Sequence, residues 1–209
     1  MAARFGARFV PCFPDAALHY ASASNDAQVV ALAPAQPLLK VCLFGPESTG
    51  KTTLATRLAQ HYRTAYAADY VRAYLDVTGS LGTIDDVPWI ARGQLATEAV
   101  VAAQAERVLI CDTTLASVAL WSEVLYGATP EWVRDQALQQ RYDLWLLTDI
   151  DVPFEPDRLR CFPEPAQRAW FMAECRRMLG ELEVAAVLVR GSEHKRLSLA
   201  CTTIDQMLR

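Results

Sequence analysis

The sequence predicts an α/β protein with a doubly wound parallel sheet whose two faces are covered by helices, a three-layer α/β/α arrangement. From residue 38 onward, short apolar runs of strand length alternate with longer segments of helical spacing, as in chains that form parallel sheets. The first apolar run leads into a glycine-containing loop that ends in Lys51 and Thr52. That combination is typical of a P-loop fold, in which a strand, a phosphate-binding loop and a helix follow one another.

Each element of this pattern has its own signal. Leu54, Leu58 and Tyr62 share one face of the first predicted helix, Gly127 should stop a later one, and Gly180 should cap the next. In chain order we predict a strand at 38–44, a helix at 52–62, a strand at 65–68, a helix beginning at 71–75, a loop at 78–86, a helix at 88–107, a strand at 108–111, a helix at 115–126, a strand at 144–147, a helix at 166–179, a strand at 184–189 and a helix at 195–208.

Composition and net charge indicate which kinds of partner this chain can bind. Of 209 residues, 52% are hydrophobic and 21% charged, as in folded globular proteins rather than disordered ones. The net charge of −4 offers no basic surplus of the kind that binds nucleic acid. Apolar runs such as 184–189 are too short to cross a bilayer. We therefore expect a small-molecule partner and neither nucleic acid nor membrane.

The cysteines indicate the cellular compartment, and residues 1–37 differ in composition from the rest of the chain. None of the six cysteines forms a C-x-x-C pair, and no signal peptide is visible, so we expect a reducing cytoplasm. Residues 1–37 are rich in proline and alanine and read as an N-terminal extension, with an edge strand possible at 27–32. Arg4 and Arg8 precede the first acid, Asp15, as in a transit peptide, but a loosely packed extension is our preferred interpretation.

Residues 45–52 read Gly-Pro-Glu-Ser-Thr-Gly-Lys-Thr and match G-x-x-x-x-G-K-[ST] at every fixed position. Gly45 and Gly50 let the backbone curl so that successive N–H groups converge on one anion, and the helix that follows adds its positive end. Lys51 should reach the β- and γ-phosphates of ATP, and the Thr52 hydroxyl should ligate Mg²⁺. The remaining residues expected to contact the nucleotide around this motif are Glu47, Ser48, Thr49 and Thr53.

A second acid follows the apolar run 108–111. In P-loop proteins, an acid at the end of this strand holds magnesium, so we expect a metal role for Asp112. If the two strands are neighbours, Asp112 lies near Thr52. The alternative is that Asp112 caps the helix predicted from 115, a role that Thr113 or Thr114 could also fill.

Several separated segments together resemble the ribosylnicotinamide kinase domain of the bacterial trifunctional NAD-biosynthesis regulator. The likeness runs from about residue 38 to the C-terminus and leaves out the first 37 residues. It rests on Gly45-Pro-Glu-Ser-Thr-Gly-Lys-Thr-Thr53, Ala68-Asp-Tyr-Val-Arg-Ala-Tyr-Leu75, Gln94 after Trp89, Ile110-Cys-Asp-Thr113, Trp121-Ser-Glu-Val-Leu-Tyr-Gly127 and Asp151-Val-Pro-Phe-Glu-Pro-Asp-Arg-Leu-Arg160.

The resemblance implies a P-loop nucleoside-kinase-like fold that transfers the γ-phosphate of ATP–Mg²⁺ to a nucleoside 5′-hydroxyl, with nicotinamide riboside as acceptor. It implies acceptor contacts by Asp69, Arg72 and Gln94, with Asp69 or Asp112 as general base. It also implies a lid around 153–170 whose arginines stabilise the transferring phosphoryl group. The lid arginines are Arg158, Arg160 and Arg168, with Arg160 the strongest candidate; Gly191 and Ser192 would hold the adenine.

Other interpretations of the same residues stay open. The lid arginines could be solvated surface charges, and Asp69 could be a surface acid paired with Arg72. Related sequences often carry acids where this chain has Thr114 and Ala73, so the acceptor could differ from nicotinamide riboside. Beside a small-molecule kinase, the sequence allows a nucleotide-dependent regulatory switch; a nucleic-acid-dependent motor fits poorly with the small size and acidic charge.

Overall fold

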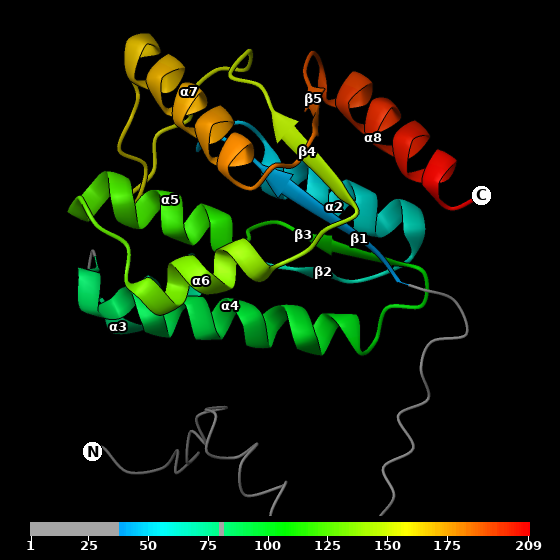
Figure 1. Cartoon of the computed structure of the whole chain (residues 1–209). Coiled ribbons are helices and arrows are strands. Elements are labelled where there is room, and N and C mark those ends of the chain that lie inside the picture. Colours follow the sequence, from blue (N-terminus) through cyan, green and yellow to red (C-terminus); the bar gives the residue numbers. More distant parts are fainter. Residues whose placement is uncertain (1–37, 80–81) are drawn as a thin grey trace, which may run out of the picture. The chain divides into compact units, whose positions relative to one another are not determined.

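A computed structural model describes residues 38–79 and 82–209. Among these residues, five strands form one sheet in the order β2-β3-β1-β4-β5, and every neighbouring pair is parallel (Figure 1). Because all strands run the same way, their carboxyl ends meet at one edge, where α/β proteins bind ligands. The strands are β1 (Leu39–Phe44), β2 (Tyr66–Ala67), β3 (Val108–Cys111), β4 (Leu144–Thr148) and β5 (Ala186–Val189).

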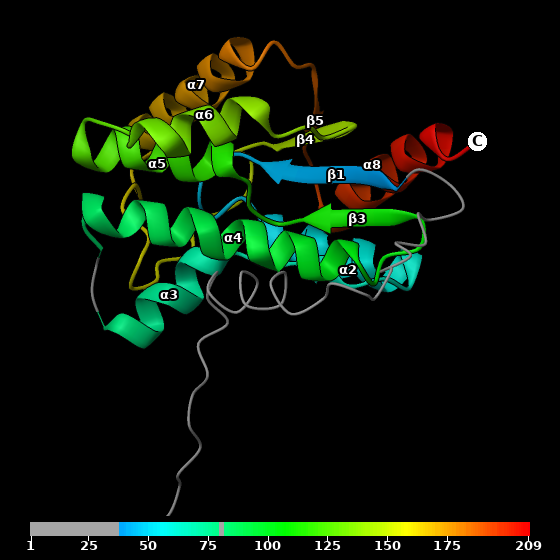
Figure 2. The same cartoon turned by 60° about the horizontal axis from the view of Figure 1, so that its bottom comes forward.

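Helices cover both faces of the sheet. Alternate residues of β1 divide between two cores: Val41 and Leu43 pack with α2 and α8, whereas Cys42 and Phe44 pack with the helices of the opposite face. Figures 1 and 2 show α5, α6 and α7 together on that second side. The predicted three-layer α/β/α fold is confirmed. The helices are α2 (Lys51–Tyr62), α3 (Tyr70–Thr78), the 3₁₀ turn η1 (Ile84–Asp86), α4 (Val87–Ala102), α5 (Leu115–Tyr126), α6 (Glu131–Gln139), α7 (Pro165–Glu181) and α8 (Glu193–Met207).

Two helix ends differ from the sequence predictions. Helix α4 ends at Ala102 rather than 107, because Arg107 already belongs to the sheet register: its carbonyl accepts a hydrogen bond from the Leu39 N–H at 2.9 Å. Gly180 does not cap α7 but lies inside it, and the left-handed residue beyond the helix is Glu183, with φ 54°. The Gly127 stop after α5 is confirmed, with φ 70°.

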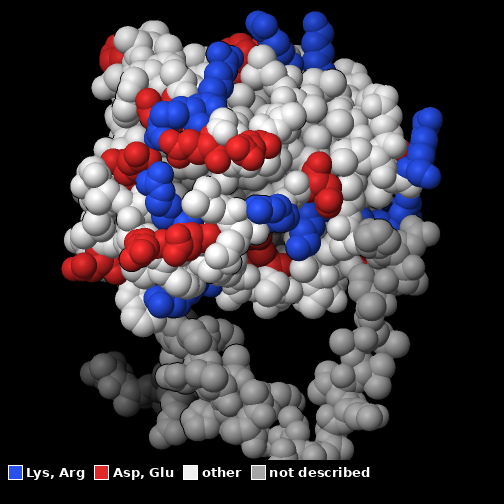
Figure 3. All heavy atoms as spheres, viewed as in Figure 1, with Lys and Arg blue, Asp and Glu red and all other residues white. Residues whose placement is uncertain are grey.

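Helix α6 was not predicted. Its short length and polar composition hide it, although Val133 and Ala137 at i, i+4 spacing are its buried residues and Pro130 precedes it. The edge strand expected at 27–32 lies outside the described residues. None of the described helices combines the length and apolar character needed to cross a membrane. On the face shown in Figure 3, acidic and basic side chains are interspersed rather than segregated.

Candidate active site

The loop between β1 and α2 needs glycine at two positions for different reasons. Gly45 has φ 138°, and a Cβ there would lie 2.7 Å from the Thr148 hydroxyl oxygen on β4. Gly50 has φ 80° and opens onto empty space, so only its backbone conformation demands glycine. The left-handed φ of 54° at Ser48 adds a third sharp bend. The curled loop that the motif predicts is present.

Buried threonines fasten this loop to the sheet. Thr49 is fully buried; its Oγ1 donates to the Pro46 carbonyl at 2.6 Å and lies 2.7 Å from Thr148 Oγ1. Thr49 was expected to contact the nucleotide, and both hydrogen bonds of its side chain are made within the protein. It therefore stabilises the loop, and any contact with a phosphate must come from its backbone.

Lys51 and Thr52 open helix α2. The Lys51 ammonium donates to the carbonyls of Gly45 at 2.9 Å and Pro46 at 2.6 Å, so it is folded back over the loop. Burial lowers the pKa of Lys51, and the nearby carboxylate of Asp112 opposes that shift. A lysine with its charge desolvated beside a curled loop is suited to receive a phosphate anion.

Asp112 lies where the strand order places it, next to Thr52. The Thr52 hydroxyl donates to Asp112 Oδ2 at 2.6 Å, while Oδ1 is buried with no hydrogen-bond partner among the described residues. A buried carboxylate oxygen without a partner, beside a hydroxyl, is a donor set that suits Mg²⁺. The helix-capping role falls to Thr114 instead, whose Oγ1 accepts from the Ser117 N–H at 3.3 Å.

A second carboxylate, Asp69, faces the same place from the end of β2. It caps α3 by accepting from the Val71 N–H at 3.1 Å. Burial raises the pKa of Asp69, although Lys51 and Arg72 favour its charged form. Burial also raises the pKa of Asp112, and the charge of Asp69 adds to that rise. Two acids with raised pKa values and one buried lysine thus converge at the carboxyl ends of neighbouring strands.

Gln94 was expected to contact the acceptor, and the structure gives it another role. Its side chain is fully buried on α4: Oε1 accepts from the Tyr70 N–H at 3.0 Å and Nε2 donates to the Thr113 carbonyl at 3.1 Å. The amide therefore ties the start of α3 to the segment after β3. Gln94 positions the two elements that carry Asp69 and Asp112, and its amide atoms are engaged within the protein.

The segment between β4 and α7, residues 152–162, passes over the loop and is called the lid below. Arg160 Nη1 donates to Ser48 Oγ at 3.3 Å, which brings this predicted catalytic arginine to the phosphate loop. Arg158 instead pairs with Asp76 on α3, away from the loop. Arg168, already within α7 and buried, donates to the carbonyls of Val152 at 2.9 Å and Ser48 at 3.4 Å, so it secures the base of the lid.

The acidic residue of the loop also holds the lid. Glu47 Oε1 accepts from the N–H groups of Cys161 at 2.7 Å and Phe162 at 2.6 Å, and burial raises the pKa of Glu47. Ser48 Oγ accepts from the Glu155 N–H at 2.8 Å. In this conformation, both side chains expected at the nucleotide connect the loop to the lid.

The turn between β5 and α8, expected to hold the adenine, is fixed by residues that the sequence did not single out. Gly191 has φ 90° and donates its N–H to Asp151 at 2.6 Å, and Ser192 caps α8. The buried guanidinium of Arg196 pairs with Asp151 and donates to the Thr49 carbonyl at 2.8 Å. No local sequence signal marks an arginine as buried, because its partners lie far along the chain.

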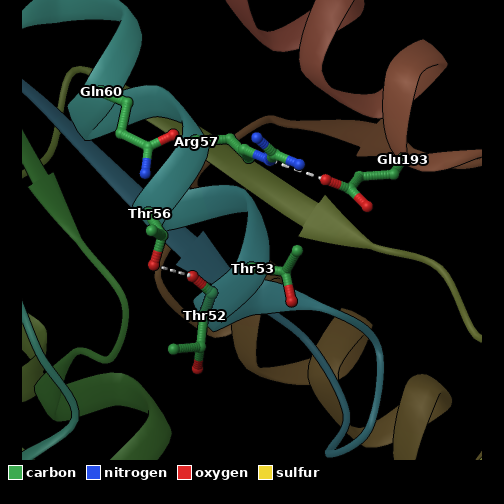
Figure 4. A pocket seen from close by; sticks show the side chains of 6 residues that line it. All are labelled: Thr52, Thr53, Thr56, Arg57, Gln60 and Glu193. Atoms are coloured by element: carbon green, nitrogen blue, oxygen red, sulfur yellow. Dashed lines mark hydrogen bonds and ion pairs between the residues drawn. The ribbon is translucent and has the colours of Figure 1, made fainter.

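An open hollow of about 390 Å³ runs along α2 toward α8 (Figure 4). The Arg57 guanidinium pairs across it with Glu193 at 2.8 Å. Thr53, the last residue expected at the nucleotide, lines this hollow beside Thr52. Glu193, the first residue of α8, lines the same hollow. Its lining residues are Thr52, Thr53, Thr56, Arg57, Gln60 and Glu193.

A parallel sheet with a P-loop after β1 and a buried acid after β3 defines a P-loop protein with a three-layer α/β/α fold. The chain belongs to the family described as AAA domain, whose model matches residues 40–196.

Comparison with known proteins adds relatives and structural neighbours. The chain is 26% identical over 168 residues to the trifunctional NAD biosynthesis/regulator protein NadR of Salmonella typhimurium, with 78% of this chain and 41% of that protein covered. It therefore spans about two fifths of that relative. A crystal structure of NadR protein in complex with NR superposes with a TM-score of 0.66 at 20% identity, over 81% of this chain and 50% of that one. Thymidylate kinase from Ehrlichia chaffeensis superposes with a TM-score of 0.57 at 11% identity, over 83% and 100%.

Proposed function

We propose that the protein is an ATP- and Mg²⁺-dependent kinase of a small nucleoside, with nicotinamide riboside as the acceptor, acting in the cytoplasm. The observation that carries the proposal is the pair of carboxylates at the ends of β2 and β3. Asp112 is joined to the Thr52 hydroxyl of the P-loop helix, whereas Asp69 stands beside Arg72 on the acceptor side. One acid for the metal and one for the acceptor hydroxyl is what phosphoryl transfer to an alcohol requires.

The residues divide the chemistry between them. Thr52 and Asp112 would hold Mg²⁺, which when bound neutralises charge on the phosphate oxygens. Lys51 leaves the loop carbonyls for the β- and γ-phosphates, and Arg160, already at Ser48, offsets charge on the transferring group. Asp69 orients the acceptor hydroxyl and takes its proton; Asp112 is the second candidate for that proton. Arg72 holds the acceptor against α3.

The choice of nicotinamide riboside rests on the relatives. The relative in sequence is named for NAD biosynthesis, one structural neighbour is a complex with NR, and a further NadR structure is a complex with NAD and AMP-PNP. The five cysteines of the described residues are free thiols, which supports a reducing compartment. The net charge of −4 supports a small-molecule partner over nucleic acid.

The test is ADP release from ATP–Mg²⁺ with and without nicotinamide riboside, together with detection of nicotinamide mononucleotide. Release that depends on the riboside, and falls by about 10²–10³-fold in Lys51→Ala, supports the proposal. Lys40→Ala, an exposed lysine near the start of β1, is the matched control. If ATP binds but no riboside-dependent release follows, the acceptor is wrong, and other nucleosides are tested next. ATP turnover that no nucleoside stimulates favours the regulatory switch.

A further inference from the structure

The lid is anchored firmly at its two ends. At its C-terminal end, the ring of Phe162 stacks on Trp121 with centroids 5.7 Å apart and 4° between the planes. At its N-terminal end, the Val152 carbonyl accepts from the buried Arg168 guanidinium. Between these anchors the backbone depends on side chains for its position, and the central side chain there is Asp157.

One oxygen of the Asp157 carboxylate accepts two backbone hydrogen bonds, and the other forms ion pairs with two arginines. Oδ1 accepts from the N–H groups of Leu159 at 2.8 Å and Arg160 at 3.0 Å. Oδ2 lies 3.0 Å from Arg72 Nη2 and 3.1 Å from Arg160 Nε. Partial burial works against ionisation, but the Leu159 N–H and the two guanidinium groups outweigh it and hold the pKa of Asp157 below its usual range. The carboxylate is charged and its orientation is fixed.

The two arginines that Asp157 joins belong to opposite sides of the site. Arg72 on α3 lies 4.0 Å from Asp69, the acid proposed to meet the acceptor. Arg160 lies 3.3 Å from the Ser48 hydroxyl of the phosphate loop. A single carboxylate oxygen therefore fixes the distance between the acceptor-side cation and the phosphate-side cation. If the carboxylate is lost, the two guanidinium groups face each other without an anion between them, and we expect their repulsion to move them apart.

We propose that Asp157 is a positioning residue for phosphoryl transfer, aligning Arg72 at the acceptor with Arg160 at the transferring phosphate so that α3 and the lid act as one unit. Its role as a turnover determinant rests on the proposed kinase function. Asp157 touches neither reactant in this arrangement; it acts through the two guanidinium groups.

The chain supplies a matched control in a second ion pair between the lid and α3. Arg158 pairs with Asp76, one turn beyond Arg72, and both side chains are largely exposed, at 50% and 67%. Asp76 therefore ties the same two segments together, and no ion pair or hydrogen bond joins it to Arg72 or Arg160 among the described contacts. Asp76→Asn makes the same chemical change as Asp157→Asn, at a position where only a surface pair is lost.

The experiment compares kcat and acceptor KM for Asp157→Asn, Asp157→Glu and Asp76→Asn with ATP–Mg²⁺ and nicotinamide riboside. We expect Asp157→Asn to lower kcat by about 30-fold and raise acceptor KM by about tenfold, as for the loss of charge-assisted hydrogen bonds. Asp157→Glu should recover part of kcat, and Asp76→Asn should stay within about twofold. Cooperative thermal unfolding of every variant shows that the fold is intact.

A double variant separates positioning from general structural support. If Asp157 acts on the acceptor through Arg72, adding Asp157→Asn to Arg72→Gln lowers kcat further but leaves acceptor KM where Arg72→Gln set it. A further tenfold rise in KM overturns the proposal, as does an Asp157→Asn enzyme that behaves like Asp76→Asn.

A second readout keeps this inference separate from the proposed function. If the wild-type chain phosphorylates no nucleoside, the kinase proposal fails, and amide hydrogen exchange with AMP-PNP–Mg²⁺ decides about Asp157. Asp157→Asn should then speed exchange both at 70–73 and at 158–162, whereas Asp76→Asn leaves both slow. Faster exchange in only one of the two segments, or in neither, refutes the coupling.

Discussion

The phosphate loop and the lid face each other across the site, but they are held by different forces. The loop is fixed by glycine conformations and by the buried hydroxyls of Thr49 and Thr148, within a few residues of the strands that carry it. The lid is fixed by carboxylate and guanidinium groups that meet across long sequence separations, such as Arg158 with Asp76. The first arrangement is buried and depends on backbone conformation and hydroxyl groups, whereas the second is half-exposed and depends on charges, so the two should respond differently to substitution and to pH.

The acids at the strand ends beside the phosphate loop and the acids in and near the lid have pKa values shifted in opposite directions. Burial raises the pKa values of Asp69 and Asp112, so their ionised forms cost folding free energy at neutral pH. In Asp157 and Asp151, N–H donors and arginines outweigh partial burial and depress the pKa values. Asp157 in the lid and Asp151 just before it therefore stabilise the fold when ionised, and that contribution is lost as pH falls through their depressed pKa values. The buried acids behave oppositely: their contribution is lost as pH rises through their raised pKa values.

The largest expected effect is at the metal acid. Asp112→Asn removes a charge beside Thr52 while keeping the side chain's size, so kcat should fall by about 10²–10³-fold and the Mg²⁺ concentration for half-maximal rate should rise. A magnesium titration of turnover measures both. Asp135→Asn, an exposed acid on α6, is the control. A variant that needs no more Mg²⁺ than wild type would show that Asp112 does not hold the metal.

Gln94→Leu tests whether the buried region depends on hydrogen bonds that no ligand supplies. The change leaves the Tyr70 N–H and the Thr113 carbonyl without their partner, so the free energy of unfolding should fall by roughly 2–3 kcal/mol. Urea unfolding measures it, with Gln139→Leu at the exposed end of α6 as the matched change. Full stability combined with a raised acceptor KM would instead restore Gln94 to the acceptor pocket that the sequence suggested.

Asp69→Asn should separate activity from stability. Asparagine can still cap α3, but it carries no charge beside Asp112, so turnover should fall by about 10²-fold while stability at neutral pH rises by about 1 kcal/mol. The native state of the wild type binds the Asp69 proton more tightly than the unfolded state, so the gain should shrink when urea unfolding is repeated at pH 4.5. Asp76→Asn on the same helix should show neither effect. A loss of stability at pH 7.5 would mean that the Asp69 charge stabilises the native state.

The sequence predicts the phosphate loop and the metal acid, but it does not predict the polar contacts that hold the surrounding elements together. Thr52 and Asp112 could be placed together because each follows an apolar strand, and parallel strands bring their carboxyl ends to one edge. The sequence also predicts the loop, since its glycines and its strand–helix context are local. It does not predict that Asp157 pairs with two arginines, that Arg196 is buried against the phosphate loop, or that Gln94 connects α3 to the segment after β3. Each of them has a partner far along the chain, such as Thr113 for Gln94, Arg72 for Asp157 and Thr49 for Arg196, and such pairings depend on how the elements pack.

The smallest expected effect falls on Arg158, which the sequence grouped with Arg160. Its partner is the exposed Asp76, and an exposed ion pair contributes little, so Arg158→Ala should change kcat by less than about twofold and stability by less than about 0.5 kcal/mol. Arg160→Ala, at the phosphate loop, should lower kcat by about 10²-fold in the same assay. Equal losses in the two variants would mean that the lid rearranges around ATP until Arg158 reaches the phosphates. The half-exposed ion pairs of the lid would then be a resting arrangement, and the contrast with the fixed loop would be sharper than this structure shows.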